Sequence, residues 1–124
     1  MQGFRNLNVW RKAHELTLEV YKVTARFPRE ERYALTSQIK RAASSIGANI
    51  AEGCARGSDA DFTRFLFIAM GSANELENHL ELARDLGFLC QTDYGDLQNR
   101  LVEVKRMLTG LIHSTQTKVL HAQG

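Results

Sequence analysis

The histidine, cysteine and acidic side chains of this sequence are its first candidates for chemistry. Glu75 and His79 stand four residues apart, so on a helix they share one face. A di-iron site in a helix bundle needs Glu-x-x-His on two helices, and no glutamate here precedes a histidine by three residues. The other histidines, His14, His113 and His121, stand in unrelated contexts. We therefore expect no metal site and no cofactor.

Cys54 is the strongest candidate nucleophile, but no histidine lies at helical spacing from it to orient or activate the thiol. The segment GCARG, residues 53–57, has two glycines but lacks the Lys-Ser/Thr pair of a phosphate-binding loop. We therefore expect a protein that is not an enzyme, with no catalytic residues. Cys54 and Cys90 have no metal-ligand spacing, and we favour two free thiols over the alternative of one disulfide.

Basic residues gather around the first predicted turn and the start of the second predicted helix. As candidate nucleic-acid contacts we take Arg26, Arg29, Arg32, Lys40 and Arg41. Repeated around a cyclic assembly, such a patch would form a ring of positive potential, and phosphate contacts would dominate its affinity. The alternative is an ordinary solvated face, because acids are interspersed: Glu15, Glu19, Glu30 and Glu31.

Composition bounds these hypotheses. The chain has 124 residues, 44% of them hydrophobic and 24% charged, as in one globular domain, and its net charge is only +2. Residues 1–57 carry ten Lys or Arg against five Asp or Glu, and residues 58–124 carry six against nine. The basic half could meet an anionic partner or the acidic half of another copy. With no membrane-spanning run and no signal-peptide pattern, we expect a cytoplasmic protein that does not bind membranes.

Apolar residues recur in steps of four and three along most of the chain, which predicts amphipathic helices throughout. Four such stripes begin at Val9, Leu35, Phe62 and Leu97. Pro28 interrupts the first, Gly53 or Gly57 can supply a left-handed stop after the second, and Ser58 and Thr92 are candidate caps. We predict helices near 7–26, 30–55, 59–86 and 93–116, with a frayed tail over 117–124. Short connections favour an all-α, antiparallel up-down four-helix bundle as a single domain over residues 1–124.

The segment RAASSIGANIAEG, residues 41–53, is rich in small residues and has more apolar surface than one bundle stripe needs. A thicker core within one chain or contact with another copy would use this surface, and we favour self-association. The predicted oligomer interface comes from the second and third helices: Ala43, Ile46, Ile50, Phe65, Ile68 and Ser72.

Polar residues also fall on the predicted core side of this segment. An amide such as Asn49 needs its hydrogen bonds satisfied when buried, and Glu52 needs a cationic partner. We predict a structural network of Arg41, Asn49 and Glu52.

Four segments carry a family resemblance: FRNLNVWRKAHEL, FPREERYALTSQIKRAASSIGANIAEG, FTRFLFIAMGSANELENHLELARDLGFL and MLTGLI. Over about residues 4–112 they resemble the four-helix-bundle family labelled 23S rRNA intervening-sequence proteins. The resemblance implies a left-handed up-down bundle and a ring-like homopentamer. The accessory variability determinant of diversity-generating retroelements is similar to this family and binds nucleic acid. Many other members have no assigned role.

Two functions follow as hypotheses. The first is a non-enzymatic scaffold of unknown cellular role that forms a cyclic homo-oligomer, so that its partner is another copy of itself. The alternative is an accessory protein that binds RNA or DNA through the basic face. A net charge of +2 and an acidic third helix count against the alternative.

Overall fold

The computed structural model describes residues 3–123 and is helical, with no strand in that range. Two single 3-10 turns, η1 (Phe4–Asn6) and η2 (Arg29–Glu31), accompany four long helices. The long helices are α1 (Asn8–Thr24), α2 (Leu35–Ala55), α3 (Asp59–Asp85) and α4 (Gln91–Gln123). The predicted all-α class and the number of long helices are confirmed for the described residues.

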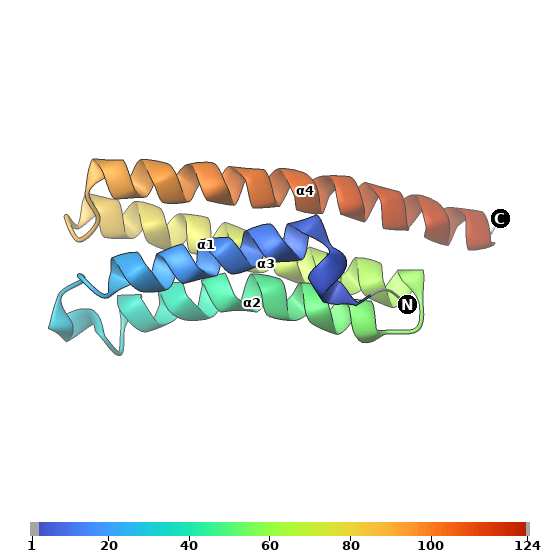
Figure 1. The fold of residues 1–124 in the computed structure, drawn as a ribbon, viewed down its shortest axis with the longest axis horizontal. Helices are drawn as coiled ribbons and strands as arrows, with labels where there is room; N and C mark the ends of the chain where they lie inside the picture. The colour runs from blue at the N-terminus through green and yellow to red at the C-terminus, as the bar shows by residue number, and fades with distance from the viewer. Residues whose placement is uncertain (1–2, 124) are drawn as a thin grey trace.

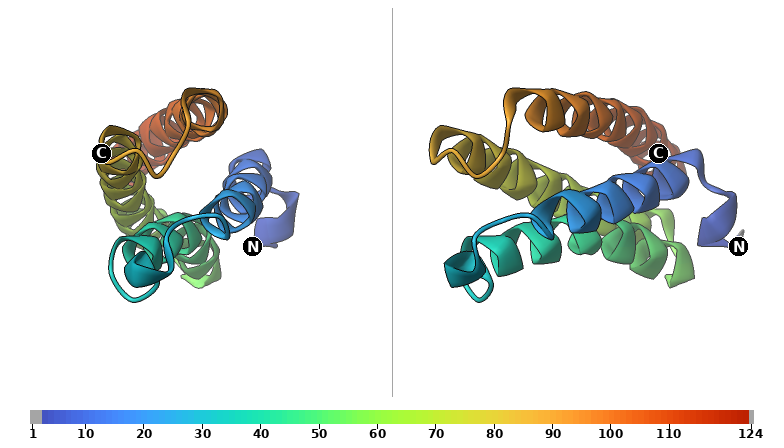
Figure 2. Two further views of the ribbon diagram at one scale, coloured as in Figure 1. Left: turned by 90° about the vertical axis from the view of Figure 1, so that its left-hand side faces the viewer. Right: turned by 60° about the vertical axis from the view of Figure 1, so that its left-hand side comes forward.

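The four long helices surround one core. α1 packs on α2, α2 on α3, α3 on α4 and α4 on α1, and the end-on view shows the four arranged around a common centre (Figure 2). The α1–α2 and α3–α4 connections lie at one end of the molecule, and the α2–α3 connection lies at the other (Figure 1).

The core is built from the predicted stripes. Ala13, Leu16 and Val20 of α1 are fully buried, and equivalent runs of α2, α3 and α4 meet them in a single cluster. Each stripe recurs in steps of four and three because that spacing keeps side chains on one face of an α-helix. Removal of this apolar surface from water is the main stabilising term of the fold.

The small residues of α2 bring its neighbours close within the chain. The Thr17 hydroxyl of α1 lies 3.1 Å from the carbonyl oxygen of Ala43. A Cβ added at Gly47 would lie 3.4 Å from the indole nitrogen of Trp10, and one added at Gly53 would lie 2.9 Å from Phe65 Cβ. The second apolar face of RAASSIGANIAEG is thus used by α1 and α3, which supports the thicker-core alternative.

Several predicted boundaries differ from the structure. α2 begins at Leu35, five residues after the predicted start, because Ala34 has a non-helical backbone and only the isolated turn η2 precedes it. Gly53 lies inside α2, and Gly57 also lacks a positive φ. Within residues 3–123 the left-handed residue is Gly87, with φ 81°, and Phe88 N donates to Ala83 O, which closes the end of α3.

Ser58 caps α3 as predicted, since its hydroxyl accepts from Asp61 N at 3.1 Å. Thr92 is not the cap of α4, because that helix has already begun at Gln91.

The predicted frayed tail is wrong for residues 117–123, because α4 continues helically to Gln123. Thr115 is buried against Thr63 of α3, with their hydroxyl oxygens 2.7 Å apart, and Val119 lines a surface hollow with Ala60 and Thr63. Contacts with the start of α3 therefore support the helix past its predicted end. Gly124, the last residue of the predicted tail, lies outside the described residues.

Candidate functional site

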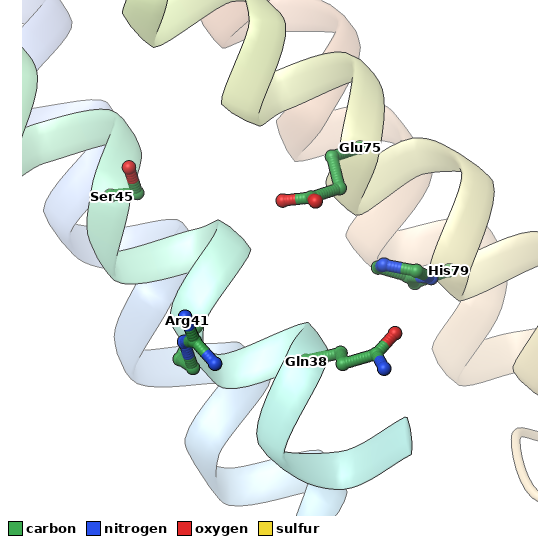
Figure 3. A pocket seen from close by; sticks show the side chains of 5 residues that line it. All are labelled: Gln38, Arg41, Ser45, Glu75 and His79. Atoms are coloured by element: carbon green, nitrogen blue, oxygen red, sulfur yellow. The ribbon is translucent and has the colours of Figure 1, made fainter. Parts of the chain in front are cut away.

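A polar groove with a charged lining lies between α2 and α3, and the spacing of apolar residues did not predict it. It has a volume of about 480 Å³ and is lined by Gln38, Arg41 and Ser45 of α2 and by Glu75 and His79 of α3. Figure 3 shows Gln38, Glu75 and His79 reaching into the space between the two helices. The sequence signal was the four-residue spacing of Glu75 and His79, which puts both on one face of α3.

The groove contains unpaired polar groups. His79 Nδ1 is buried and has no hydrogen-bond partner within residues 3–123, and neither Arg41 nor Glu75 makes an ion pair with a described residue. Ser45 Oγ accepts from Asn49 Nδ2 at 3.0 Å and from Ser72 Oγ at 2.9 Å. Since both lone pairs of Ser45 Oγ are engaged, this hydroxyl is a structural group in the observed geometry.

The predicted network of Arg41, Asn49 and Glu52 does not form. Asn49 donates to Ser45 O at 2.8 Å as well as to Ser45 Oγ, and Glu52 instead pairs at 2.8 Å with Arg56, the residue that follows the end of α2. The amide is satisfied within α2, and the link to α3 runs through Ser72. The physical reason is rotation: Asn49 faces the α3 side of α2, whereas Glu52 is exposed.

The predicted oligomer interface is wrong for its α2 residues. Ala43, Ile46 and Ile50 are fully buried in the single chain, so no surface remains there for another copy. Phe65 is 9% exposed because the guanidinium groups of Arg56 and Arg64 lie over its ring, 4.9 and 4.5 Å from the centroid.

The two α3 positions left from that interface have different surroundings. Ser72 is half-buried and donates to Ser45 within the chain. Ile68 is exposed.

Apolar side chains remain exposed along α3. Ile68, Leu82 and Leu86 are 42%, 44% and 53% exposed. Steps of four and three connect them through Ser72, Glu75 and His79, so they form one line of residues that borders the polar groove. We call this line the outer stripe of α3: Ile68, Ser72, Glu75, His79, Leu82 and Leu86.

The structure divides the predicted basic cluster. Arg26 Nη2 lies 3.1 Å from Asp93 Oδ2 at the start of α4, and Arg41 lines the α2–α3 groove. Arg29, Arg32 and Lys40 line a different cavity of about 400 Å³, formed by the end of α1, the following turn and the start of α2. Arg26 and Arg41 therefore do not belong to the same surface as the other three, because helix rotation and the Asp93 contact direct them elsewhere.

Groups that could support metal or thiol chemistry lie apart. Within the described range, no three His, Cys, Asp or Glu side chains gather in a way that could hold a metal ion. His14 is exposed and stacks on Trp10, with ring centroids 4.8 Å apart. Cys54 and Cys90 are unbonded, and burial raises the pKa of the Cys54 thiol.

None of the helices, over the residues described, is long and apolar enough to cross a membrane.

A half-buried ion pair joins α3 to α4, where Lys105 Nζ lies 2.8 Å from Glu77 Oε1. Hydrogen bonds from Lys105 and then from Gln98 lower the pKa of Glu77.

Comparison with known proteins adds a family and a solved structure. Residues 5–110 match the family described as 23S rRNA-intervening sequence protein. A crystal structure from Bacteroides thetaiotaomicron VPI-5482, of a protein with unknown function from the S23 ribosomal protein family, is 31% identical, with a TM-score of 0.79. The match covers 85% of this chain and 95% of that one. No curated protein matches. With residues 5–110 matched, the chain belongs to the 23S rRNA-intervening sequence protein family.

Proposed function

We propose that this protein is a non-enzymatic scaffold that self-associates through the outer stripe of α3. The observation that carries the proposal is the exposure of Ile68 and Leu82 on one face of the 27-residue helix α3, and of Leu86 directly after its last residue. A helix that packs in an isolated bundle needs one apolar stripe, and α3 already has one in the core. Three further apolar side chains, exposed in line on the outer face and separated by polar ones, suit a surface that another protein covers.

The proposed monomer is an antiparallel up-down bundle, supported by connections that lie at alternate ends of the molecule (Figure 1). Its assembly is a cyclic homo-oligomer in which the α3 face of one copy meets a different face of the next. Such head-to-tail contacts close into rings when the rotation allows. Charge supports this pairing, because residues 1–57 are net basic and residues 58–124 net acidic. A left-handed bundle and a pentamer remain predictions from the family resemblance.

The polar residues in the middle of the outer stripe could make the contact between copies specific. Glu75 and His79 lie between Ile68 and the two leucines, and Glu75 makes no ion pair with any described residue. A basic side chain of the neighbouring copy could pair with this carboxylate. Polar groups at an interface restrict which partner and which register are accepted. We place the assembly in the cytoplasm, which its two unbonded thiols support.

The test is the native mass, measured by light scattering after size exclusion, of wild type and of the variants Ile68→Glu and Leu82→Glu. The matched control is Val102→Glu on α4, since Val102 is 41% exposed and Ile68 42%. We expect both α3 variants to stay folded but to give a smaller species, while Val102→Glu keeps the wild-type mass. A monomeric wild type at tens of micromolar, or equal masses for all four proteins, would exclude this interface.

A nucleic-acid-binding accessory function is the second candidate, as in the accessory variability determinant that resembles the family. Arg29, Arg32 and Lys40 make no ion pair within the described part of the chain, which supports this function. The test is fluorescence anisotropy with a structured RNA and a duplex DNA at two salt concentrations. Binding that weakens steeply with salt and is lost when these three residues become Glu supports the candidate. Unchanged affinity in that triple variant rejects it.

A further inference from the structure

The cavity at the α1–α2 end of the bundle has a wall of cations and small polar groups. Its volume is about 400 Å³, and its lining includes Arg29, Arg32, Thr36 and Lys40 together with the apolar residues Phe27 and Pro28. No carboxylate belongs to this lining. The cavity therefore has the charge of an anion site and an apolar side against which a carbon skeleton could rest.

Thr36 lines this cavity and has a buried hydroxyl that no described group uses. The residue is only 7% exposed, and its Oγ1 is buried with no hydrogen-bond partner in the described chain. A buried hydroxyl without a partner is unfavourable by about 1–3 kcal/mol in proteins, so the position calls for an explanation. By contrast, the buried hydroxyls of Thr24 and Thr115 donate to backbone carbonyls at 2.8 and 3.1 Å. If the Thr36 side chain turned its hydroxyl toward the cavity, a ligand oxygen there would give it the partner that the protein does not supply.

The start of α2 forms part of the cavity wall through Thr36 and Lys40. Thr36 stands in the first turn of this 21-residue helix, whose N-cap residue Ala34 provides no side-chain hydrogen bond. The first backbone N–H groups of a helix have no intrahelical acceptor, and the helix dipole makes this end positive. One of these N–H groups, that of Leu35, already donates to the Glu31 carboxylate at 3.4 Å, so the protein itself supplies part of the negative charge that this helix end favours.

The cations around the cavity are free to meet a ligand. Arg26, two residues before Pro28, is paired with Asp93, whereas no described acid lies within 4.0 Å of the charged groups of Arg29, Arg32 and Lys40. The Lys40 ammonium lies 4.8 Å from the centre of the Tyr21 ring, which holds the chain against α1 beside the cavity.

We propose that this cavity binds the phosphate group of a small phosphomonoester. A terminal phosphate offers three oxygens and close to two negative charges at neutral pH, enough to engage the Thr36 hydroxyl and the cations together. The phosphate of a nucleic-acid backbone is flanked by sugars on both sides, so it would meet the exposed cations without entering to reach a buried hydroxyl. The site requires neither self-association nor nucleic-acid binding and goes beyond both proposed functions.

The test is isothermal titration of the full chain with inorganic phosphate and with glycerol 3-phosphate, at constant ionic strength and with chloride as the background anion. Binding of both ligands at one site per chain, with glycerol 3-phosphate the tighter, identifies a phosphomonoester pocket. Tighter binding of inorganic phosphate assigns the site to the free ion and overturns the small-molecule part of the proposal. No binding of either ligand overturns the whole.

Three variants distinguish a specific phosphate pocket from non-specific attraction of phosphate to the positive charges. Thr36→Val removes the hydroxyl at equal size and should weaken phosphate binding roughly tenfold, as expected for a lost hydrogen bond to a charged group. Arg32→Gln should weaken it to a similar or greater degree. Arg41→Gln removes the same charge in the other groove and should leave binding unchanged. Unchanged affinity in Thr36→Val, or equal losses in Arg32→Gln and Arg41→Gln, would overturn the site.

A competition experiment distinguishes the two kinds of phosphate. A DNA duplex without terminal phosphates should not displace glycerol 3-phosphate, because it offers only backbone phosphates. Displacement by that duplex that is lost in Thr36→Val would assign the cavity to nucleic acid and overturn the proposal.

Discussion

Gly53 of α2 lies so close to Phe65 of α3 that a Cβ added to the glycine would stand 2.9 Å from Phe65 Cβ. Real Cβ atoms do not approach this closely, and Phe65 Cβ is fixed to the backbone, so it cannot swing away. The same added atom would lie 2.9 Å from Phe62 Cδ1. The crossing of α2 and α3 near their connection therefore depends on the missing side chain of Gly53.

Gly53→Ala should accordingly destabilise the fold. Overpacking of a tight contact costs about 1–3 kcal/mol, and this cost should exceed the gain of up to about 1 kcal/mol from replacing glycine within a helix. The matched control is Gly71→Ala on α3, where an added Cβ meets nothing within 4 Å. We expect Gly71→Ala to stabilise by about 0.5–1 kcal/mol. Urea unfolding measures both; a stabilised Gly53→Ala would show that the helices can separate freely.

Two buried threonines provide a second matched pair. Thr115 is 2% exposed, and its hydroxyl donates to Ile112 O and lies 2.7 Å from Thr63 Oγ1, whereas the Thr36 hydroxyl has no described partner. Thr115→Val should lower the free energy of unfolding by about 1 kcal/mol. Thr36→Val, measured without phosphate, should be neutral or stabilising. Equal losses in the two variants would mean that Thr36 already has a partner in solution.

The Glu77–Lys105 pair makes stability depend on pH in a defined direction. Because the pKa of Glu77 is lowered in the fold, its contribution is present above the ordinary value of 4.5 and is lost as pH falls through the lower folded value. Glu77→Gln should therefore be destabilising at pH 7, by about 0.5–1 kcal/mol for this partly exposed pair. The difference from wild type should shrink below pH 4.5.

Urea unfolding of wild type and Glu77→Gln at pH 7 and pH 3 measures this effect. Glu103→Gln is the control, because Glu103 belongs to the more exposed pair with Arg106. A Glu77→Gln difference that grows toward low pH would contradict the assigned role of Lys105.

The two thiols should differ in reactivity. Cys90 is exposed in the α3–α4 connection, whereas Cys54 is buried and its pKa is raised by that burial, so less of it is thiolate at neutral pH. Titration with a colourimetric disulfide reagent at pH 8 should show one fast and one slow thiol. Cys90→Ser should remove the fast phase and Cys54→Ser the slow phase, while denaturant should make the thiols react equally. Two equally fast thiols in the native protein would contradict the burial of Cys54.

Much of this architecture could be predicted from the spacing of apolar residues. The stripe from Val9 to Phe27 is buried throughout, and Ser58 caps α3, because helix faces and caps depend on residues at most a few positions apart. The family resemblance carried by the RAA-SI-NIAEG segment agrees with the match over residues 5–110.

Relations between helices could not be predicted in this way. Spacing within α2 shows that Ala43, Ile46 and Ile50 are on an apolar face, but burial depends on whether another helix of the chain or another copy covers that face. Likewise, the basic residues near the first turn lie close together in sequence, while Arg41 belongs with Glu75 and His79 to the lining of the α2–α3 groove (Figure 3).

Local periodicity therefore specified four long helices, most of the core and one cap. Three features appeared only in the packed bundle. They are the helices that cover the small-residue face of α2, the α2–α3 groove, and the separation of Arg41 from Arg29, Arg32 and Lys40. The physical reason is that the rotation and offset of one helix against another arise from contacts between residues tens of positions apart. The repeat of apolar residues within a single helix does not predict those contacts.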